Sequence, residues 1–298
     1  MKILLTGAFG FIGRVLLRTL AESGHDLIAA GRPSQRDLPP AAGAGPPITS
    51  LYVDLSRDRI QDRLDGGVEA VVHAAATSPD QGKPLARMIE DNLQATANLV
   101  EFALKAGAKK FVFTSSISVY GRVESPVVDE STPIIDPDPY GLTKLLGELI
   151  LEEASPHLPS VSLRLPGVLG KGNNRIWLAH VVRKAARDEE IPVYHPDAPF
   201  NNAVHVLDLA GFVGSLLERE WTGRQAFPLA AAEPMTVGEV VETIVASLNS
   251  KSKIKEVEAT RPSFVISSRW AEDRFGYTPR PIRTLLERFV HESGNHST

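Results

Sequence analysis

Short apolar segments of strand character alternate with helical segments through the first half of the sequence. Ile3-Leu4-Leu5-Thr6 stops at Gly7, and residues 11–20 then carry apolar side chains at helical spacing. The same pattern predicts strands over 26–30, 51–53, 68–75, 111–113 and 161–165, and helices over 85–106 and 140–153. Apolar strands joined by helices predict an α/β fold with a doubly wound parallel sheet covered on both faces.

The pattern changes after Leu165, where Pro166 and Gly167 interrupt it. Helical segments expected over 176–187, 207–217, 237–248 and 285–291 mix with short apolar pieces. We therefore expect a sheet domain over 1–165 and a smaller, mainly substrate-binding lobe over 166–298, with segments returning to the sheet. The Pro-, Ala- and Gly-rich stretch from Pro39 to Pro47 predicts an exposed loop.

Composition excludes several classes of function. The chain has no cysteine, which removes disulfides, thiolate nucleophiles, Cys-ligated zinc and iron–sulfur clusters. The 32 basic and 36 acidic residues are spread along the chain, so no nucleic-acid or membrane partner is expected. The eight histidines form no metal-ligand spacing, and we expect no metal site. The first residues do not resemble a signal peptide, and we expect a soluble, cytoplasmic protein.

A glycine-rich turn lies between the first strand and the first helix. Gly7 permits the tight turn, Gly10 lets a pyrophosphate approach the backbone, and Gly13 lets helix and sheet pack closely. The phosphates would lie on the N–H groups at the positive end of the helix. A glycine-lined turn without a ligand is the alternative interpretation, but the strand–turn–helix context favours a Rossmann-type dinucleotide site.

The end of the second strand bears on the choice of cofactor. It reads Ala29-Ala30-Gly31-Arg32, with no carboxylate, and Arg36 follows. An acidic residue at this place favours NAD, whereas a cation accommodates the 2′-phosphate of NADP. The sequence therefore predicts NADP as the favoured cofactor and NAD as the alternative. A solvated arginine in a loop is the interpretation without a ligand.

A tyrosine and a lysine begin the helix expected over 140–153. Tyr140 and Lys144 are four residues apart and so project from one face. A nearby ammonium favours the phenolate, so Tyr140 could exchange a proton with a carbonyl or an alcohol near neutral pH. Ser116 follows the fifth strand at the carboxyl edge of the sheet, and its hydroxyl could bind the reacting oxygen. These three residues are the candidates for catalysis, with Ser115 and Thr114 as less favoured alternatives to Ser116.

These motifs together resemble the extended short-chain dehydrogenases/reductases, in the NAD-dependent epimerase/dehydratase group. The resemblance starts at Thr6-Gly7-Ala8-Phe9-Gly10-Phe11-Ile12-Gly13 and extends over about residues 1–210 in collinear order. It continues through Val72-His73-Ala74-Ala75-Ala76, Tyr140-Gly141-Leu142-Thr143-Lys144 and Val204-His205-Val206-Leu207-Asp208. It places Asp54 near the adenine and Lys144 near the nicotinamide ribose.

The resemblance implies further site residues. Beside the glycines, the cofactor would contact Phe9, Phe11, Ile12, Arg32, Asp54, Leu55, Ala74, Ala75, Ala76, Asn92, Tyr140, Lys144, Pro166 and Val168. The substrate would contact Thr77, Ser116, Ser118, Asn201 and Arg261. Asn92, near the start of the helix over 85–106, would support a proton relay, although an asparagine there is more often a cap.

The second half departs from the pattern of nucleotide-sugar enzymes. Asn201 stands where such enzymes usually place an arginine for the substrate's diphosphate, and Arg261 only loosely resembles a second such arginine. Ile117-Ser118 stands where dehydratases of the group carry an Asp-Glu pair, so dehydration is not expected.

Three functions remain open at this stage. The favoured one is an NADPH-linked reductase acting on a carbonyl or alcohol carbon of a sugar-like or other small substrate. The alternatives are a nucleotide-sugar epimerase with tightly bound cofactor and, in another class, a non-catalytic NADP-binding redox sensor. The helices over 85–106 and 140–153 resemble the pair that forms dimer contacts in the family, which implies a homodimer.

Overall fold

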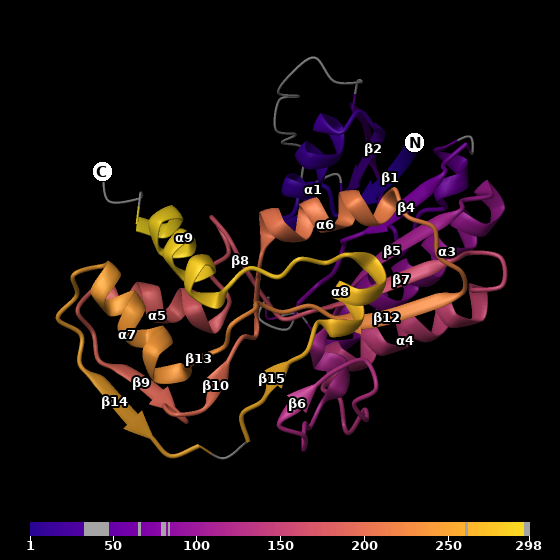
Figure 1. Cartoon of the computed structure of the whole chain (residues 1–298). Coiled ribbons are helices and arrows are strands. Elements are labelled where there is room, and N and C mark those ends of the chain that lie inside the picture. The colour runs from indigo at the N-terminus through magenta and orange to yellow at the C-terminus, as the bar shows by residue number, and fades with distance from the viewer. Residues whose placement is uncertain (33–47, 65–66, 79–81, 83, 260–261, 295–298) are drawn as a thin grey trace. The chain divides into compact units, whose positions relative to one another are not determined.

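The computed structural model describes residues 1–32, 48–64, 67–78, 82, 84–259 and 262–294 (Figure 1). The chain forms two compact units. The first comprises Met1–Gly121, Asp136–Arg164 and Leu207–Ala226, and the second Arg122–Ile135, Leu165–Val206 and Phe227–Thr298. The chain passes from the first unit to the second at Leu165, and the predicted domain ranges 1–165 and 166–298 stay a prediction. Residues 207–226 return to the first unit and residues 122–135 leave it.

A seven-stranded sheet forms the centre of the first unit, in the order β12-β7-β5-β4-β1-β2-β3. The pairings from β3 through β2, β1 and β4 to β5 are parallel. The strands are β1 (Lys2–Thr6), β2 (Asp26–Gly31), β3 (Ile48–Tyr52), β4 (Ala70–His73), β5 (Lys110–Ser116), β7 (Ser160–Leu165) and β12 (Arg224–Pro228). This order confirms the predicted doubly wound fold.

Helices cover both faces of this sheet. Figure 1 shows α1 and α6 along one face, where Gly214 of α6 lies against Leu20 of α1, and α3 and α4 along the other. The helical elements are α1 (Phe11–Glu22), η1 (Ile60–Asp62), α2 (Leu85–Met88), η3 (Ile89–Gln94), α3 (Ala95–Ala106), η4 (Ile117–Tyr120), α4 (Pro139–Ala154) and α6 (Val206–Leu217).

Burial on both faces explains why these strands read as unbroken apolar segments. Ile3, Leu4 and Leu5 of β1 are all fully buried, although their side chains alternate between the faces. On the α3 and α4 face, aromatic side chains of β5 pack with aliphatic side chains of both helices: Phe111, Phe113, Leu99 and Leu151. This core fixes the carboxyl edge of the sheet, where the candidate site lies.

The second unit has short strands and four helices among its described residues. Its strands are β6 (Val127–Val128), β8 (Gly167–Leu169), β9 (Ile191–Tyr194), β10 (Pro199–Phe200), β11 (Ala203–His205), β13 (Met235–Thr236), β14 (Ile254–Val257) and β15 (Val265–Ile266). Its helices are α5 (Trp177–Ala185), α7 (Val237–Ser247), α8 (Arg269–Phe275) and α9 (Ile282–Gly294). An apolar core built mainly from α5, α7 and α9 holds it together.

The structure departs from the sequence pattern in four places. β12 and α8 were not expected, because their short segments carry no long apolar run. The helix expected over 85–106 is present, but η3 is a π-helical turn inside it. β3 begins at Ile48 rather than at Leu51. The loop expected from Pro39 to Pro47 lies outside the described residues. In the part of the chain that is described, no helix has the length and apolarity that crossing a membrane requires.

Candidate active site

The glycine-rich turn brings β1, α1 and the segment after β4 into close contact. Gly7 has a φ of +68°, and a Cβ built on it would lie 2.6 Å from the backbone nitrogen of Ala75. A Cβ on Gly13 would lie 1.9 Å from the carbonyl oxygen of Gly7. Both positions therefore require glycine. Gly10, the N-cap of α1, has no side chain to cover the end of the helix. This is the geometry of a backbone cradle for phosphate.

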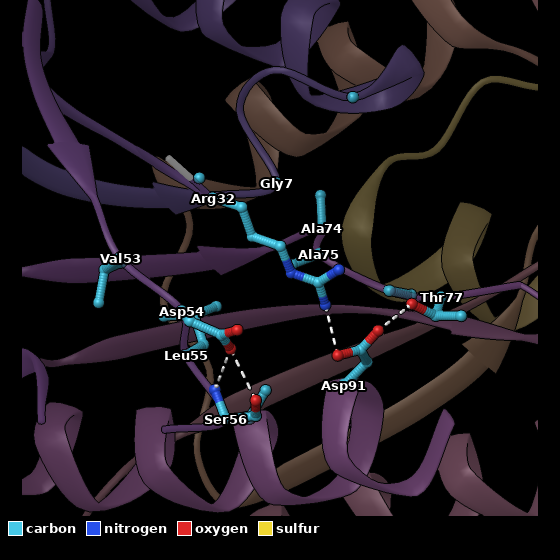
Figure 2. Close-up of a pocket in the computed structure, with 14 residues that line it drawn as sticks. Gly7, Arg32, Val53, Asp54, Leu55, Ser56, Ala74, Ala75, Thr77 and Asp91 are labelled. Atoms are coloured by element: carbon cyan, nitrogen blue, oxygen red, sulfur yellow. Dashed lines mark hydrogen bonds and ion pairs between the residues drawn. The ribbon is translucent and has the colours of Figure 1, made fainter. Parts of the chain in front are cut away.

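A cleft of about 200 Å³ extends from this turn across the carboxyl ends of β1, β2 and β4 (Figure 2). It is lined by the predicted cofactor residues Gly7, Gly10, Arg32, Asp54, Leu55, Ala74, Ala75 and Ala76, and by Thr77. It is also lined by five residues that the sequence did not single out: Gly31, Val53, Ser56, Asp91 and Ala95. The three alanines have small side chains and so leave the cleft open, whereas larger side chains at these positions would fill it.

Four predicted cofactor residues of the turn do not line this cleft: Phe9, Phe11, Ile12 and Gly13. Phe9 is buried, and its ring packs 5.8 Å from that of Tyr52. A Cβ on Gly31 would lie 2.3 Å from the Phe9 ring, so glycine at the end of β2 makes room for this aromatic side chain. Phe9 thus holds the turn against β2.

Asp54 lies on the far side of the cleft. Its Oδ1 accepts hydrogen bonds from the backbone nitrogen of Ser56 (3.1 Å) and from the Ser56 hydroxyl (2.6 Å). Burial raises the pKa of Asp54, but these hydrogen bonds and the charges of Arg32 and Arg87 outweigh it and lower the pKa. Asp54 is therefore a carboxylate at neutral pH, able to accept a hydrogen bond from an adenine amino group.

The three predicted catalytic residues come from α4 and the end of β5. Asp138 caps α4 by accepting a hydrogen bond from the backbone nitrogen of Gly141 (2.7 Å). A Cβ on Gly141 would lie 2.1 Å from the carbonyl oxygen of Ser118, so glycine lets the first turn of α4 pack against η4. This close contact brings Tyr140 to the same edge of the sheet as Ser116.

Lys144 is the third of the predicted catalytic residues. Its Nζ donates a 2.8 Å hydrogen bond to the carbonyl oxygen of Thr114 and lies 5.9 Å from the centre of the Tyr140 ring. The side chain is buried, with 2% of the residue exposed. Burial lowers the pKa of Lys144 to about 7, against the opposing charge of Glu148. An amine that titrates near neutral pH beside a phenol suits proton transfer.

Ser116 adds a hydroxyl at the end of β5. Its Oγ accepts a hydrogen bond from the backbone nitrogen of Ser118 (3.1 Å) and lies 3.2 Å from the Ser118 hydroxyl. The predicted substrate residues Ser116 and Ser118 are therefore neighbours in one hydrogen-bonded turn. Ser116, Tyr140 and Lys144 all belong to the first unit, and their catalytic roles stay a prediction.

The depressed pKa of Lys144 predicts a pH dependence of stability. An unfolded lysine titrates near ~10.4, whereas the folded one titrates at about 7. Between these values the unfolded chain binds more protons than the folded one. The contribution of Lys144 to the free energy of unfolding therefore increases from pH 7 to pH 10 and decreases as the pH falls over the same range. In Lys144→Met the rise should be smaller. Urea unfolding at several pH values would measure it, and parallel curves for the two proteins would contradict it.

Comparison with known proteins agrees with this geometry. Residues 3–228 match the model of the NAD dependent epimerase/dehydratase family. This chain belongs to that family. A UDP-glucose 4-epimerase of Corynebacterium glutamicum is 28% identical, with 96% of this chain and 94% of the relative covered. A 3-beta-hydroxysteroid dehydrogenase of Mycolicibacterium neoaurum is 25% identical over 84% of this chain and 71% of the relative.

Solved structures show the same fold. The structure of MoeE5 in complex with UDP-glucose and NAD superimposes with a TM-score of 0.83, at 25% identity and with both chains fully covered. The epimerase/dehydratase family name implies a nicotinamide dinucleotide. The residues present here fit it, because side chains at Gly7 or Gly13 would fill the cradle and the cleft continues from it to Arg32.

Asn92 lies in the π-helical turn η3 and does not cap a helix. Its amide accepts a hydrogen bond from the backbone nitrogen of Thr77 (2.7 Å) and donates to the Thr77 carbonyl (3.0 Å). It also donates to the Thr143 hydroxyl (3.1 Å), next to Lys144. Asn92 thus connects the segment after β4 to α4. Its predicted contact with the cofactor stays a prediction.

The remaining predicted residues of the epimerase/dehydratase site lie in the second unit or outside the described part of the chain. Pro166 and Val168 are buried beside and within β8. Asn201 is buried, and its amide bonds the backbone at Ala231 and Ile266, which gives it a structural role there. Its predicted substrate contact, like the roles of Pro166 and Val168, stays a prediction. Arg36 and Arg261 lie outside the described residues.

Sequence reasoning missed Asp91, the buried carboxylate of the cleft. Its Oδ1 lies 2.5 Å from Arg32 Nη2, and its Oδ2 accepts a hydrogen bond from the Thr77 hydroxyl (2.6 Å). One signal was present: Arg87 and Asp91 are four residues apart and form an ion pair on the helix (2.8 Å). Nothing in the sequence indicated that a π-helical turn aims this carboxylate into the cleft.

Proposed function

We propose that this chain is an NAD-dependent nucleotide-sugar epimerase. The observation that carries the proposal is that one unit holds both the glycine-lined cleft and a Lys144 amine that lies 5.9 Å from the Tyr140 ring and donates to the carbonyl of Thr114, two residues before Ser116. The relatives support the choice of an epimerase, because the Corynebacterium protein is a UDP-glucose 4-epimerase and MoeE5 was solved with UDP-glucose and NAD.

The chain's own residues would handle the proton of the substrate hydroxyl. The Tyr140 phenolate would take this proton as the hydroxyl becomes a carbonyl and would return it when the hydroxyl re-forms on the other face. Lys144 favours the phenolate through the positive charge of its protonated form, which a pKa of about 7 makes available up to neutral pH. The hydroxyl of Ser116 would donate a hydrogen bond to the same oxygen and orient it. Bound NAD supplies the hydride acceptor and, after reduction, the hydride donor.

Incubation with UDP-glucose and UDP-galactose tests the proposal. An epimerase oxidises and re-reduces the same carbon, so product should appear while the absorbance of the reduced nicotinamide shows no net change. Proton NMR of the anomeric signals would measure the interconversion. Accumulation of reduced nicotinamide in proportion to product would show a dehydrogenase instead, and inactivity on a panel of nucleotide sugars would contradict the epimerase.

A reductase is the second candidate. It is favoured by Asn201, which stands where nucleotide-sugar enzymes usually carry an arginine, and by the steroid dehydrogenase among the relatives. A reductase would consume the reduced cofactor when given a ketone. Arg32 underlies the expectation that this cofactor is NADPH. The same absorbance assay with NADH, NADPH and a panel of ketones separates this function from epimerisation.

We also propose a homodimer through the helices over 85–106 and 140–153. Large apolar side chains are exposed on both: Leu85, Ile89, Leu142 and Leu149. Leu142 and Leu149 are seven residues apart and share one helix face, and α2 and η3 contact α4. A second copy would cover these side chains.

Sedimentation analysis tests the dimer. Leu142→Glu with Leu149→Glu should raise the dimer dissociation constant roughly tenfold or more, because a charge replaces buried apolar surface. Ile254→Glu, at an exposed apolar residue of β14, is the matched control and should leave the mass unchanged. A monomeric wild-type protein over the whole concentration range would contradict the dimer.

A further inference from the structure

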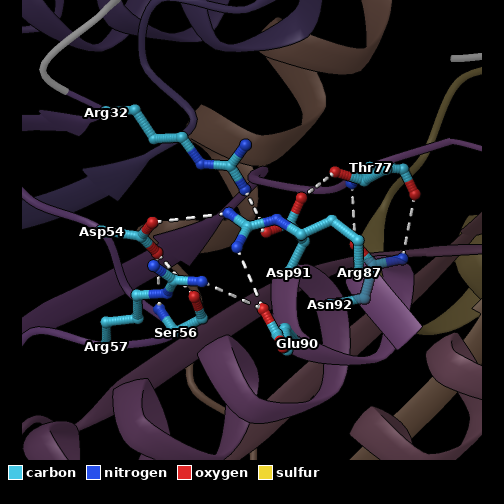
Figure 3. A network of polar contacts seen from close by, with 9 residues as sticks. All are labelled: Arg32, Asp54, Ser56, Arg57, Thr77, Arg87, Glu90, Asp91 and Asn92. Carbon is cyan, nitrogen blue, oxygen red and sulfur yellow. Dashed lines mark hydrogen bonds and ion pairs between the residues drawn. The ribbon is translucent and has the colours of Figure 1, made fainter. Parts of the chain in front are cut away.

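Two arginines and two aspartates meet at the end of the cleft next to β2 (Figure 3). Arg32 follows β2 and Arg87 belongs to α2, whereas Asp54 follows β3 and Asp91 belongs to η3. In doubly wound sheets the end of the second strand faces the adenosine ribose. The two positive and two negative charges cancel at the place where NAD and NADP differ.

Asp91 is the centre of this group. None of its side chain is exposed, and its Oδ1 lies 2.5 Å from Arg32 Nη2 and 2.8 Å from Arg87 Nη2 (Figure 2 shows the first of these contacts). Burial raises the pKa of Asp91, but contacts with Arg32 and Thr77 outweigh it and lower the pKa to about 2. The carboxylate therefore carries its charge throughout the neutral range.

Arg87 is committed to other carboxylates as well. Its Nη1 donates to Glu90 (3.0 Å), and its Nη2 lies 3.5 Å from Asp54. Arg32 is the more accessible of the two, with 34% of its side chain exposed. Of these two arginines, Arg32 is therefore the better placed to bind a phosphate at this end of the cleft, and Asp91 already compensates its charge.

A 2′-phosphate would meet two costs here. Its negative charge would stand beside the Asp91 carboxylate, and like charges repel. Drawing Arg32 away would also remove one of the guanidiniums that compensate a buried carboxylate, which is strongly unfavourable. A ribose 2′-hydroxyl is neutral and meets neither cost.

We propose that Asp91 is a specificity-determining residue: by holding Arg32 in an ion pair, it makes the cleft select the dinucleotide with a ribose 2′-hydroxyl over the one with a 2′-phosphate. The inference rests on the proposed NAD-dependent function. Arg32 alone predicts NADP, because a cation at the end of the second strand accommodates a 2′-phosphate. The inference reverses this prediction to NAD, because Asp91 of η3 supplies a carboxylate that the strand sequence does not reveal.

Fluorescence titrations of NADH and NADPH at fixed ionic strength test the inference. The wild-type protein should bind NADH more tightly. Asp91→Asn keeps the shape of the side chain and removes its charge, so the ratio of NADPH to NADH affinity should rise about tenfold or more. Arg32→Ala added to Asp91→Asn should abolish this rise, because the gain depends on the released guanidinium.

Glu90→Gln is the matched control, since Glu90 is the neighbouring carboxylate and pairs with Arg87 and Arg57. It should leave the affinity ratio near that of the wild type. An unchanged ratio in Asp91→Asn would overturn the inference. So would a wild-type preference for NADPH that Arg32→Ala removes, a measurement that does not depend on the folding of the Asp91 variant. Failure to bind either dinucleotide would refute the proposed function itself, and the inference with it.

Discussion

Tyr140→Phe is expected to lower turnover about 100- to 10,000-fold, the contribution that a positioned proton donor or acceptor makes. The substitution keeps the aromatic ring, whose centre lies 5.9 Å from Lys144 Nζ, and removes only the hydroxyl. Because Tyr140 does not line the cleft, the affinity for NADH should stay close to that of the wild type. Single-turnover kinetics and an NADH titration on the same preparation would measure both quantities.

Tyr194→Phe is the control for this result. Tyr194 is an exposed tyrosine of β9 in the second unit, and loss of its hydroxyl should change neither turnover nor NADH affinity. Full activity in Tyr140→Phe would refute the catalytic assignment. Loss of NADH binding together with activity would instead assign Tyr140 to the binding of the cofactor.

Glu148→Gln should lower the free energy of unfolding by about 3–5 kcal/mol, the usual cost of removing one partner of a buried ion pair. The carboxylate of Glu148 is completely buried, and it pairs with Arg164 Nη2 (2.8 Å) and Arg224 Nη2 (2.5 Å). It also accepts a hydrogen bond from the Ser115 hydroxyl (2.6 Å). Glutamine would leave the buried guanidinium of Arg164 without a compensating charge.

Glu152→Gln is the matched control for this prediction. Glu152 is one turn further along α4 and also pairs with Arg224 (3.3 Å), but 59% of its side chain is exposed. Its substitution should cost about 1 kcal/mol or less. Urea unfolding followed by circular dichroism at pH 7 would compare the two variants. Equal midpoints for Glu148→Gln and Glu152→Gln would contradict the buried-pair argument.

Local patterns were sufficient for much of the fold and of the site. The apolar β1, the three glycines and the Tyr140–Lys144 spacing are each read over a few residues, and the structure places all of them as expected. The glycines could be found because steric requirements at Gly7 and Gly13 depend on backbone geometry that the motif itself specifies. The position of Ser116 at the end of β5 could be predicted because the carboxyl edge of a parallel sheet is a fixed place, whereas its catalytic role stays a prediction.

Residues whose role depends on distant partners could not be read in this way. Glu148 looks in the sequence like the exposed glutamates Glu152 and Glu153 that follow it. Only the ion pairs that connect α4 to β7 and β12 in the structure reveal that Glu148 compensates Arg164 and Arg224. The strand β12 could not be predicted for the same reason. A short segment with polar residues forms a strand only where it can pair with another strand, here β7.

The π-helical turn η3 makes helix length a determinant of chemistry. Such a turn accommodates a wider hydrogen-bond spacing than the α-helix around it, and each residue of a helix advances by roughly 100°. Losing a single residue here would swing Asp91 away from the cleft while leaving the apolar face of α3 on the sheet. Two relatives with the same overall fold could therefore differ in cofactor preference through the deletion of one residue in this turn.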